Sequence, residues 1–342
     1  MCKFKNWLKA SLLISGISVI ILLVITVDSE TIDAILKIKY HYILLAIILH
    51  LIAYFTWSLR TRAMCRGINY KVRLLKCVEI ITASTFAASI TPSSIGGEPV
   101  RIELLHQNDL PRGRASAIIV GERFMDALLI LSSAPIALFI LKHAFSGSNL
   151  DVVFIIGEFI LLSALVILLY GISRPANLKR IIHFIVIRVT KLFGKKKEYQ
   201  TFYILKQIDS ELDNFHESLH MLLNVGRSSL LYGMIFTILY WILEFSILPV
   251  ILAGFNQNPP IMLAFAAQIL LLIIIAVPAK PGASGVAEFR ATTLFSVFVA
   301  SSLIGVTVIA WRAFTYYMNL LVGGFVSIKI IRDTELMNRL FG

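Results

Sequence analysis

The chain alternates long apolar segments with short polar or basic ones. A helix that crosses a bilayer needs about 20 mostly apolar residues. Two apolar stretches, 74–107 and 261–304, contain prolines and glycines, so neither is expected to form one continuous helix. The segments that predict full spans are 9–27, 40–59, 115–141, 152–172, 228–253 and 305–328. This pattern predicts an all-α polytopic membrane protein with about six full spans and two interrupted segments.

The composition agrees with a membrane protein. Hydrophobic residues make up 58% of the chain and charged residues 15%, and the mean hydropathy is +0.82. A soluble domain has about 25% charged residues, because its surface must be hydrated. The low charge content therefore excludes a soluble enzyme, a disordered chain and a nucleic-acid-binding domain. We expect no nucleic-acid partner and no cofactor, despite the net charge of +12.

The basic residues predict the orientation in the membrane. Segment 60–76 contains six basic residues and no acidic one, and segment 174–198 contains eight basic residues and one acidic one. Loops rich in lysine and arginine remain in the cytoplasm. Both segments are therefore expected to be cytoplasmic, with 28–39 and 142–151 outside. Counting spans from these positions predicts a multi-pass protein of the cell membrane with both termini in the cytoplasm.

The predicted organisation is a single membrane domain, 1–342, made of two halves. The first half covers about 40–172 and the second about 228–328. Between them, at 173–227, we expect a basic cytoplasmic linker and an amphipathic helix. Within that region, apolar residues of 201–224 recur every three or four positions with acidic residues between them, which is typical of a helix lying on a surface.

Three residues of the first half recur 189 positions later in the second half. The pairs are Pro92 and Pro281, Gly96 and Gly285, and Arg123 and Arg312. The predicted orientations of the two halves are opposite, so the sequence indicates an inverted-topology internal repeat. Interrupted apolar segments at matching positions of inverted halves indicate the central site of a transporter.

Each interruption predicts a re-entrant helical hairpin. Irregular backbone is tolerated at membrane depth only where it is buried in protein or lines a wet cavity. The second helix of each hairpin would begin near the glycines and direct its free N–H groups into the cavity. Such a helix end favours an anion, in particular a phosphate. Ordinary loops at the membrane surface are the alternative interpretation.

Charged residues inside the apolar segments are candidates for binding the anion. Arg312 is the only formally charged residue in 291–328, and a charge inside the membrane needs a partner or a path to water. Arginine suits phosphate because its guanidinium binds two oxygens at once. The candidate substrate-binding residues are Pro92, Ser93, Ser94, Gly96, Gly97, Glu98, Arg101, Glu122, Arg123, Asp126, Lys280, Pro281, Gly282, Ser284, Gly285, Glu288, Arg312 and Tyr316.

A structural interpretation of these charges stays open beside the functional one. Glu98 and Glu288 follow the two interruptions and are natural ion-pair partners for the arginines. Arg101 and Lys280 flank the interruptions, where they would attract headgroups or extend to the membrane surface. Two further acids in predicted spans, Glu158 and Glu244, would relay protons or form structural ion pairs.

One short motif suggests a metal site. His216, Glu217 and His220 match H-E-x-x-H, which on a helix places two imidazoles one turn apart for zinc. The motif lies in the polar 201–224 segment, and no third-ligand motif follows it. We therefore expect no metal site, and a membrane zinc protease is the weaker alternative.

Four segments together resemble one known family. They are P-S-S-I-G-G-E-P-V-R at 92–101, R-A-S-A-I-I-V-G-E-R-F-M-D at 114–126, K-P-G-A-S-G-V-A-E-F-R at 280–290 and W-R-A-F-T-Y-Y at 311–317. They resemble the flippase-like integral membrane family that includes the N-terminal membrane domain of lysylphosphatidylglycerol synthase, the multiple peptide resistance factor. The soluble aminoacyl-transfer domain of the full synthases has no counterpart in the sequence, so we expect a stand-alone form without catalysis.

The resemblance implies a function in lipid transport. It implies re-entrant helices around a lipid-sized cavity, and flipping of a phospholipid or a polyprenyl-phosphate-linked lipid between leaflets. The alternative is a scaffold that presents lipid to a separate enzyme without transporting it. Membrane lipids with anionic headgroups are the expected ligands. A glycosyltransferase or another lipid-modifying enzyme is the expected partner, and a second copy of the chain is another candidate.

Overall fold

The computed structural model describes residues 37–91, 96–144, 155–163, 165–166, 227–258, 260–276 and 283–341. Every regular element in these ranges is a helix. The labelled elements are α3 (Tyr40–Gly67), α4 (Leu74–Ile90), α5 (Gly97–His106), α6 (Arg112–Ala144), α10 (Arg227–Gly254), α11 (Ile261–Ala276), α12 (Ala283–Phe295), α13 (Ser301–Arg312), the π-helical turn η3 (Ala313–Tyr317) and α14 (Met318–Phe341).

Four helical segments are long and apolar enough to cross a membrane. They are Tyr40–Gly67, Arg112–Lys142, Ser228–Gly254 and Ser301–Ile330. Each contains one of the six expected spans. Of the other two, 9–27 lies outside the described residues, and 152–172 is described only in part, with residues 155–163 forming a helix.

The outer faces of the long helices are apolar. Large exposed side chains on α3 and α10 include Ile48, Leu51, Ile52, Phe55, Leu231, Ile235, Ile238 and Ile242. An exposed apolar surface of this extent marks contact with lipid or protein rather than with water. The arrangement agrees with helices whose outer faces contact hydrocarbon.

The structure confirms that the two apolar stretches are interrupted. In the first, α4 ends at Ile90 and α5 begins at Gly97. In the second, α11 ends at Ala276 and α12 begins at Ala283. Helices α10 and α11 are also separate, since α10 ends at Gly254 and α11 begins at Ile261.

The first long helix extends further than its apolar pattern indicated. The expected span ended at residue 59, and Arg60 was assigned to a cytoplasmic loop. That assignment is wrong, because α3 continues to Gly67 and the side chain of Arg60 is completely buried. A charged residue can continue a helix where a neighbouring helix supplies its partners, and here α6 does so.

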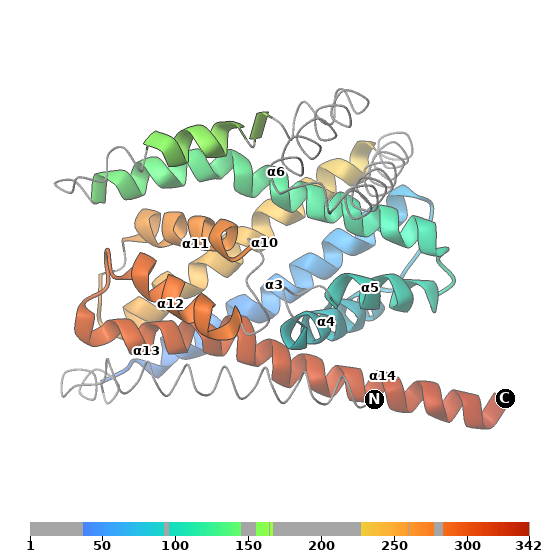
Figure 1. Ribbon diagram of the computed structural model, residues 1–342. Helices are drawn as coiled ribbons and strands as arrows, with labels where there is room; N and C mark the ends of the chain where they lie inside the picture. Colours follow the sequence, from blue (N-terminus) through green and yellow to red (C-terminus); the bar gives the residue numbers. More distant parts are fainter. Residues whose placement is uncertain are drawn as a thin grey trace, which may run out of the picture.

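Helices α3 and α10 lie side by side and antiparallel at the centre of the molecule (Figure 1). Gly67 at the end of α3 lies against Ser229 at the start of α10, and Gly254 at the end of α10 lies against Tyr42 at the start of α3. The α4–α5 pair therefore follows from one end of this central pair, and α11–α12 follows from the other end.

The order and packing of the helices correspond between the two halves. Moving the first residues of α3, α4, α5 and α6 along by 189 positions gives 229, 263, 286 and 301. Helices α10, α11, α12 and α13 begin at 227, 261, 283 and 301. The packing corresponds as well, because α4 packs on α14 and α11 packs on α6. Each interrupted segment thus contacts the long helical segment that follows the interruption in the other half.

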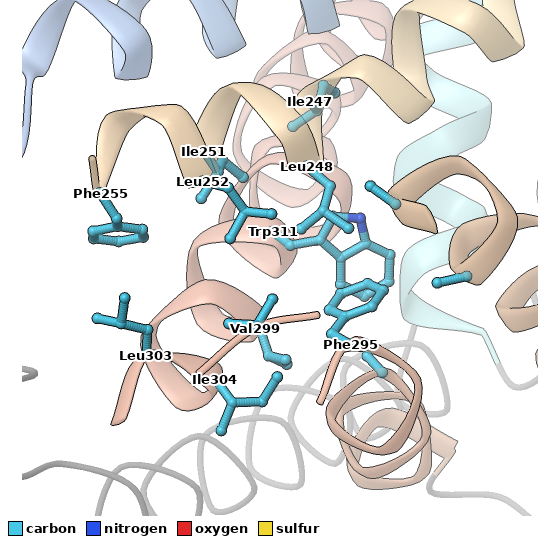
Figure 2. Close-up of a cluster of buried hydrophobic side chains, with 14 of the residues drawn as sticks. Ile247, Leu248, Ile251, Leu252, Phe255, Phe295, Val299, Leu303, Ile304 and Trp311 are labelled. Carbon is cyan, nitrogen blue, oxygen red and sulfur yellow. The ribbon is translucent and has the colours of Figure 1, made fainter. Parts of the chain in front are cut away.

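Apolar packing joins the interrupted segment of the second half to α10. Figure 2 shows this cluster, which draws on α10, α12, α13 and the turn between the last two. The Phe295 ring meets the Trp311 ring edge to face, with centroids 5.7 Å apart. The labelled members are Ile247, Leu248, Ile251, Leu252, Phe255, Phe295, Val299, Leu303, Ile304 and Trp311. A separate cluster, including Met64, Ile80, Leu105 and Ile118, joins α3 to α6 in the first half.

The close packing of α4 on α14 depends on Gly323. A Cβ atom at this position would lie 2.6 Å from the Thr82 carbonyl oxygen and 2.7 Å from the Phe86 Cβ. We expect Gly323→Ala to destabilise the protein by about 1–3 kcal/mol through overpacking. Thermal unfolding in detergent would measure this. Gly113→Ala is the matched control, because nothing lies within 4 Å of its added Cβ; an equal effect of both changes would contradict the packing argument.

Candidate functional site

A carboxylate buried among three helices forms the centre of the first half. Glu122 on α6 is 0% exposed and accepts four hydrogen bonds. Trp57 Nε1 and Arg60 Nη2 donate to Oε2 at 3.0 and 3.1 Å. Arg101 Nη2 on α5 donates to the same oxygen at 2.6 Å, and the Thr61 hydroxyl donates to Oε1 at 2.7 Å. One carboxylate therefore holds α3, α5 and α6 together.

Asp126, one turn later on α6, connects this network to α10. Arg60 Nη1 donates to its Oδ1 at 2.7 Å, and Trp241 Nε1 on α10 donates to the same oxygen at 3.0 Å. Arg123 Nη2, three residues earlier on the same helix, lies 3.3 Å from Oδ2. Arg60 also donates to the Thr237 hydroxyl on α10 at 3.2 Å. The network thus joins helices of both halves.

The charges of this network balance. Among its described members, Arg60, Arg101 and Arg123 carry three positive charges, and Glu98, Glu122 and Asp126 carry three negative ones. The carbon centres of the three guanidinium groups lie 5.4, 5.3 and 5.3 Å from the centroid of the Trp57 ring, within reach of a cation–π interaction. Balance and dense hydrogen bonding are what a buried charge cluster needs in an apolar medium.

Arg101 differs from its expected position. Its place beside the first interruption predicted a residue at the mouth of the site or at the membrane surface, but the residue is 2% exposed and paired with Glu122. The reason is that α5 folds back on α4 and turns this side chain toward α6. Its Nε and Nη1 have no hydrogen-bond acceptor among the described residues.

Arg123 and Glu98 occupy the accessible edge of the network. Their side chains are 41% and 50% exposed, and Arg123 Nε lies 3.7 Å from Glu98 Oε1. This separation is too long for a hydrogen bond. Arg123 is therefore the guanidinium of the network that a ligand reaches with the least rearrangement.

In the second half, Arg312 connects both interrupted segments. Its Nε donates to Glu288 Oε1 on α12 at 2.9 Å, and the two side chains are 12% and 2% exposed. Its guanidinium also lies 4.8 Å from the centroid of the Tyr316 ring. The Tyr316 hydroxyl donates to the carbonyl oxygen of Ser89, near the end of α4, at 3.2 Å. One arginine and one tyrosine therefore link α12 to α4.

The glycines of the first interruption have a packing role. A Cβ on Gly96 would lie 2.6 Å from the Thr91 Cγ2, and one on Gly97 would lie 3.0 Å from the Ser84 carbonyl oxygen. Both glycines allow α5 to lie close against α4. Ser284 and Gly285 lie in the first turn of α12. The candidates outside the described residues are Pro92, Ser93, Ser94, Lys280, Pro281 and Gly282.

A small cavity lies between the two groups of charges. It has a volume of about 80 Å³ and contains polar side chains from α3, α4, α10, η3 and α14. Its lining residues are His50, Tyr54, Trp57, Thr85, Tyr240, Glu244, Thr315 and Asn319. Trp57 belongs to the Glu122 network, and Thr315 immediately precedes Tyr316.

Sequence reasoning missed Trp57, Arg60, Thr61 and His50. One signal was present for Arg60 and Thr61, because the chain contains no glycine or proline from residue 60 until Gly67, so the helix was free to continue. His50 had no signal of its own. Within the described parts of the chain, no three histidine, cysteine or acidic side chains are grouped as metal ligands. The H-E-x-x-H segment lies outside them.

The helices and their buried charges define a multi-pass membrane protein. The sequence pattern described as the lysylphosphatidylglycerol synthase TM region matches residues 9–323. The chain therefore belongs to this family, a membrane domain associated with lipid flipping or lipid handling rather than a catalytic family. This confirms the resemblance drawn from the four segments.

The curated relatives that match this chain are membrane proteins, and the matches cover most of each protein. The chain is 30% identical over 301 residues to a UPF0104 membrane protein of Archaeoglobus fulgidus, covering 87% of this chain and 89% of that protein. A UPF0104 membrane protein of Methanothermobacter thermautotrophicus is 22% identical over 313 residues, covering 90% and 91%. Another, of Pyrococcus horikoshii, is 22% identical over 329 residues, covering 94% and 97%. No solved structure matches the chain.

The Glu122 network makes a prediction about stability. Glu122→Gln removes the charge that compensates Arg60 and Arg101, so we expect a loss of about 3–5 kcal/mol, as for other broken buried ion pairs. Glu103→Gln is the matched control, since its pair with Arg112 is exposed on both sides (64% for Arg112, 47% for Glu103), and exposed pairs contribute about 0–1 kcal/mol. Thermal unfolding of both variants in detergent measures the difference. Equal stability of the two variants would show that the network is not structural.

Proposed function

We propose that this protein translocates an anionic lipid, a phospholipid or a polyprenyl-phosphate-linked lipid, between the leaflets of the cell membrane. The headgroup phosphate passes close to Arg123 and Arg312 while the acyl or prenyl chains remain in the bilayer. Both termini lie in the cytoplasm in this proposal, because the basic segments 60–76 and 174–198 favour that side.

The first support is the correspondence between the halves. We infer that α3–α6 and α10–α14 are inverted-topology repeats. The central helices α3 and α10 are antiparallel, and each interrupted segment packs against the long helical segment that follows the interruption in the other half. Inverted repeats of this kind bind substrate at their interface in many transporters.

The second support is the length of the interrupted helices. Helix α5 has 10 residues and α12 has 13, so they are about 15 and 20 Å long at 1.5 Å per residue. A hydrocarbon core is about 30 Å thick. Helices this short enter a membrane without crossing it, as re-entrant hairpins do. Because the two hairpins follow from opposite ends of the α3–α10 pair, they would enter from opposite faces.

The observation that carries the proposal is the contact of both hairpins at Arg312. Through Glu288 and through Tyr316 bonded to Ser89, this residue joins α12 to the end of α4. Each half then offers one arginine beside one carboxylate, Arg123 beside Glu98 and Arg312 beside Glu288. A phosphate that displaces the carboxylate can accept two hydrogen bonds from the guanidinium at once, whereas Glu288 accepts one from Arg312 and Glu98 none from Arg123. Arg60 and Arg101, buried and tightly paired, hold the helices in place instead.

The proposal predicts the effect of neutralising the accessible arginines. In phosphatidylcholine vesicles containing fluorescent phosphatidylglycerol, we expect the protein to expose inner-leaflet label to an impermeant quencher. We expect Arg312→Ala to reduce this rate at least about tenfold, since a lost charged hydrogen bond is worth about 1.5–3 kcal/mol. Arg123→Ala should reduce it to a lesser degree, because Arg123 is more exposed and more loosely held.

Arg112→Ala is the control, because Arg112 is an exposed arginine paired only with Glu103 among the described residues. Comparing the melting temperatures of all variants in detergent separates a loss of transport from a loss of folding. Unchanged transport by Arg312→Ala would refute the role given to this residue. Absence of any transport by the folded wild-type protein would favour a lipid-presenting scaffold.

A further inference from the structure

The cavity contains a histidine whose two ring nitrogens both face oxygen atoms. His50 on α3 is 3% exposed. Its Nδ1 lies 3.0 Å from Glu244 Oε1 on α10, and its Nε2 lies 3.2 Å from Asn319 Oδ1 on α14. Three helices from both halves therefore meet at this imidazole.

The Asn319 amide is oriented by its other contacts. Its Nδ2 donates to the Thr315 carbonyl oxygen at 2.8 Å, which turns Oδ1 toward His50. The Tyr54 hydroxyl donates to the same Oδ1 and lies 3.0 Å from the Thr85 hydroxyl. Asn319 Oδ1 is thus an acceptor, as is the Glu244 carboxylate. An imidazole facing two acceptors satisfies both only when both of its nitrogens carry a proton.

Of the ionisable side chains that line this cavity, His50 and Glu244 are the best placed to exchange a proton. Tyr54 and Tyr240 are the other titratable side chains in the lining, and both are phenols with little tendency to ionise near neutral pH. Helices α4 and α14 contribute only uncharged residues to the lining, Thr85 and Asn319. Helix α11, which packs on α10, contains no charged residue.

In the part of the chain that the structure describes, the remaining charges near the pair are matched. On α3 and α6 they are Arg60, Glu122, Arg123 and Asp126, which form the network around Glu122. On the side of α12 and α13 they are Glu288 and Arg312, which pair with each other. A proton gained or lost at His50 and Glu244 is therefore a net change of charge between these two groups.

We propose that His50 and Glu244 form a proton-binding site that couples lipid movement to the transmembrane proton gradient. This inference rests on the proposed function. Without the proton, a neutral His50 beside the Glu244 carboxylate leaves one uncompensated negative charge, which repels an anionic headgroup between the arginines; the bound proton removes this charge. Lipid and proton then move in the same direction, the proton entering from water on one side and leaving to water on the other.

The structure shows how the proton connects to the helices. With the proton bound, the imidazolium attracts the Glu244 carboxylate, 3.0 Å away on α10, and its Nε2 donates to Asn319 on α14. Without it, one ring nitrogen faces an acceptor with no hydrogen between them, and one of the two contacts is lost. Asn319 follows the π-helical turn η3, and such turns are frequent at functional sites. Loss of the contact between His50 and Asn319 therefore releases a restraint on the segment that contains Tyr316, one turn after Arg312.

The test measures the leaflet distribution of lipid under a pH difference. Phosphatidylcholine vesicles with fluorescent phosphatidylglycerol are prepared with an acidic interior and an alkaline exterior, and potassium with valinomycin holds the membrane potential at zero. For one proton per lipid, a difference of one pH unit supports an outer-to-inner ratio of up to about tenfold. We expect wild-type protein to enrich the outer leaflet, and protein-free vesicles to show no enrichment.

The variants identify the coupling residues. We expect Glu244→Gln and His50→Gln to move the lipid to an equal distribution regardless of the pH difference. Glu158→Gln is the matched control, since Glu158 is also an acid in a predicted span but lies outside the cavity lining, and it should preserve the enrichment. If a variant does not fold, proton movement is measured directly on the wild-type protein. An external pH dye then reports the protons that enter the alkaline medium while lipid is transported.

The outcomes separate the two proposals. If wild-type protein moves lipid to an equal distribution whatever the pH difference, proton coupling is refuted and lipid translocation stands. If Glu244→Gln preserves the enrichment, the site is assigned to the wrong residues and the inference fails. If folded wild-type protein moves no lipid under any condition, the proposed function fails and the coupling fails with it.

Discussion

The charge of Glu122 is the constraint on which the first half of the structure depends. A carboxylate in an apolar interior is tolerated only when nearly all of its acceptor capacity is used and its charge is cancelled. Arg60 and Arg101 provide the charge, and Trp57 and Thr61 complete the hydrogen bonds. Because these donors come from α3 and α5, satisfying one side chain determines how three helices meet.

The second half meets the same constraint with fewer groups. Among the described residues, Arg312 has one carboxylate partner, Glu288, and two aromatic neighbours, Trp311 and Tyr316, in place of a network. The two halves therefore differ in how their buried charges are paired, although their helices correspond. The first half is held by a closed network that leaves only its edge, at Arg123, accessible. The second half places its arginine between Glu288 of α12 and Tyr316, which is bonded to Ser89 of α4. A carrier needs both properties, a rigid frame and a charge that can change partners.

Lipid transport fits the remaining features better than a static role does. The outer faces of α3 and α10 are apolar, as contact with acyl chains requires, while polar groups line a cavity between the halves. That cavity, with a volume of about 80 Å³, holds several water molecules but not a phospholipid headgroup with its glycerol. A lipid would enter only after the hairpins separate. The contacts of Arg312 and His50, which join elements of both halves, are the ones that such a movement breaks.

The sequence by itself determined the class of protein, four of the described long helices, and the positions of both interruptions. It also identified the arginines that recur 189 residues apart, with their acidic partners Glu98 and Glu288. These features are local, because apolar periodicity, prolines and glycines act within a few residues of their own position. Only the tertiary structure decided that Arg60 is buried and that His50 meets Glu244 and Asn319. Those contacts join residues 62 to 269 positions apart, and no local pattern specifies which distant side chain cancels a buried charge.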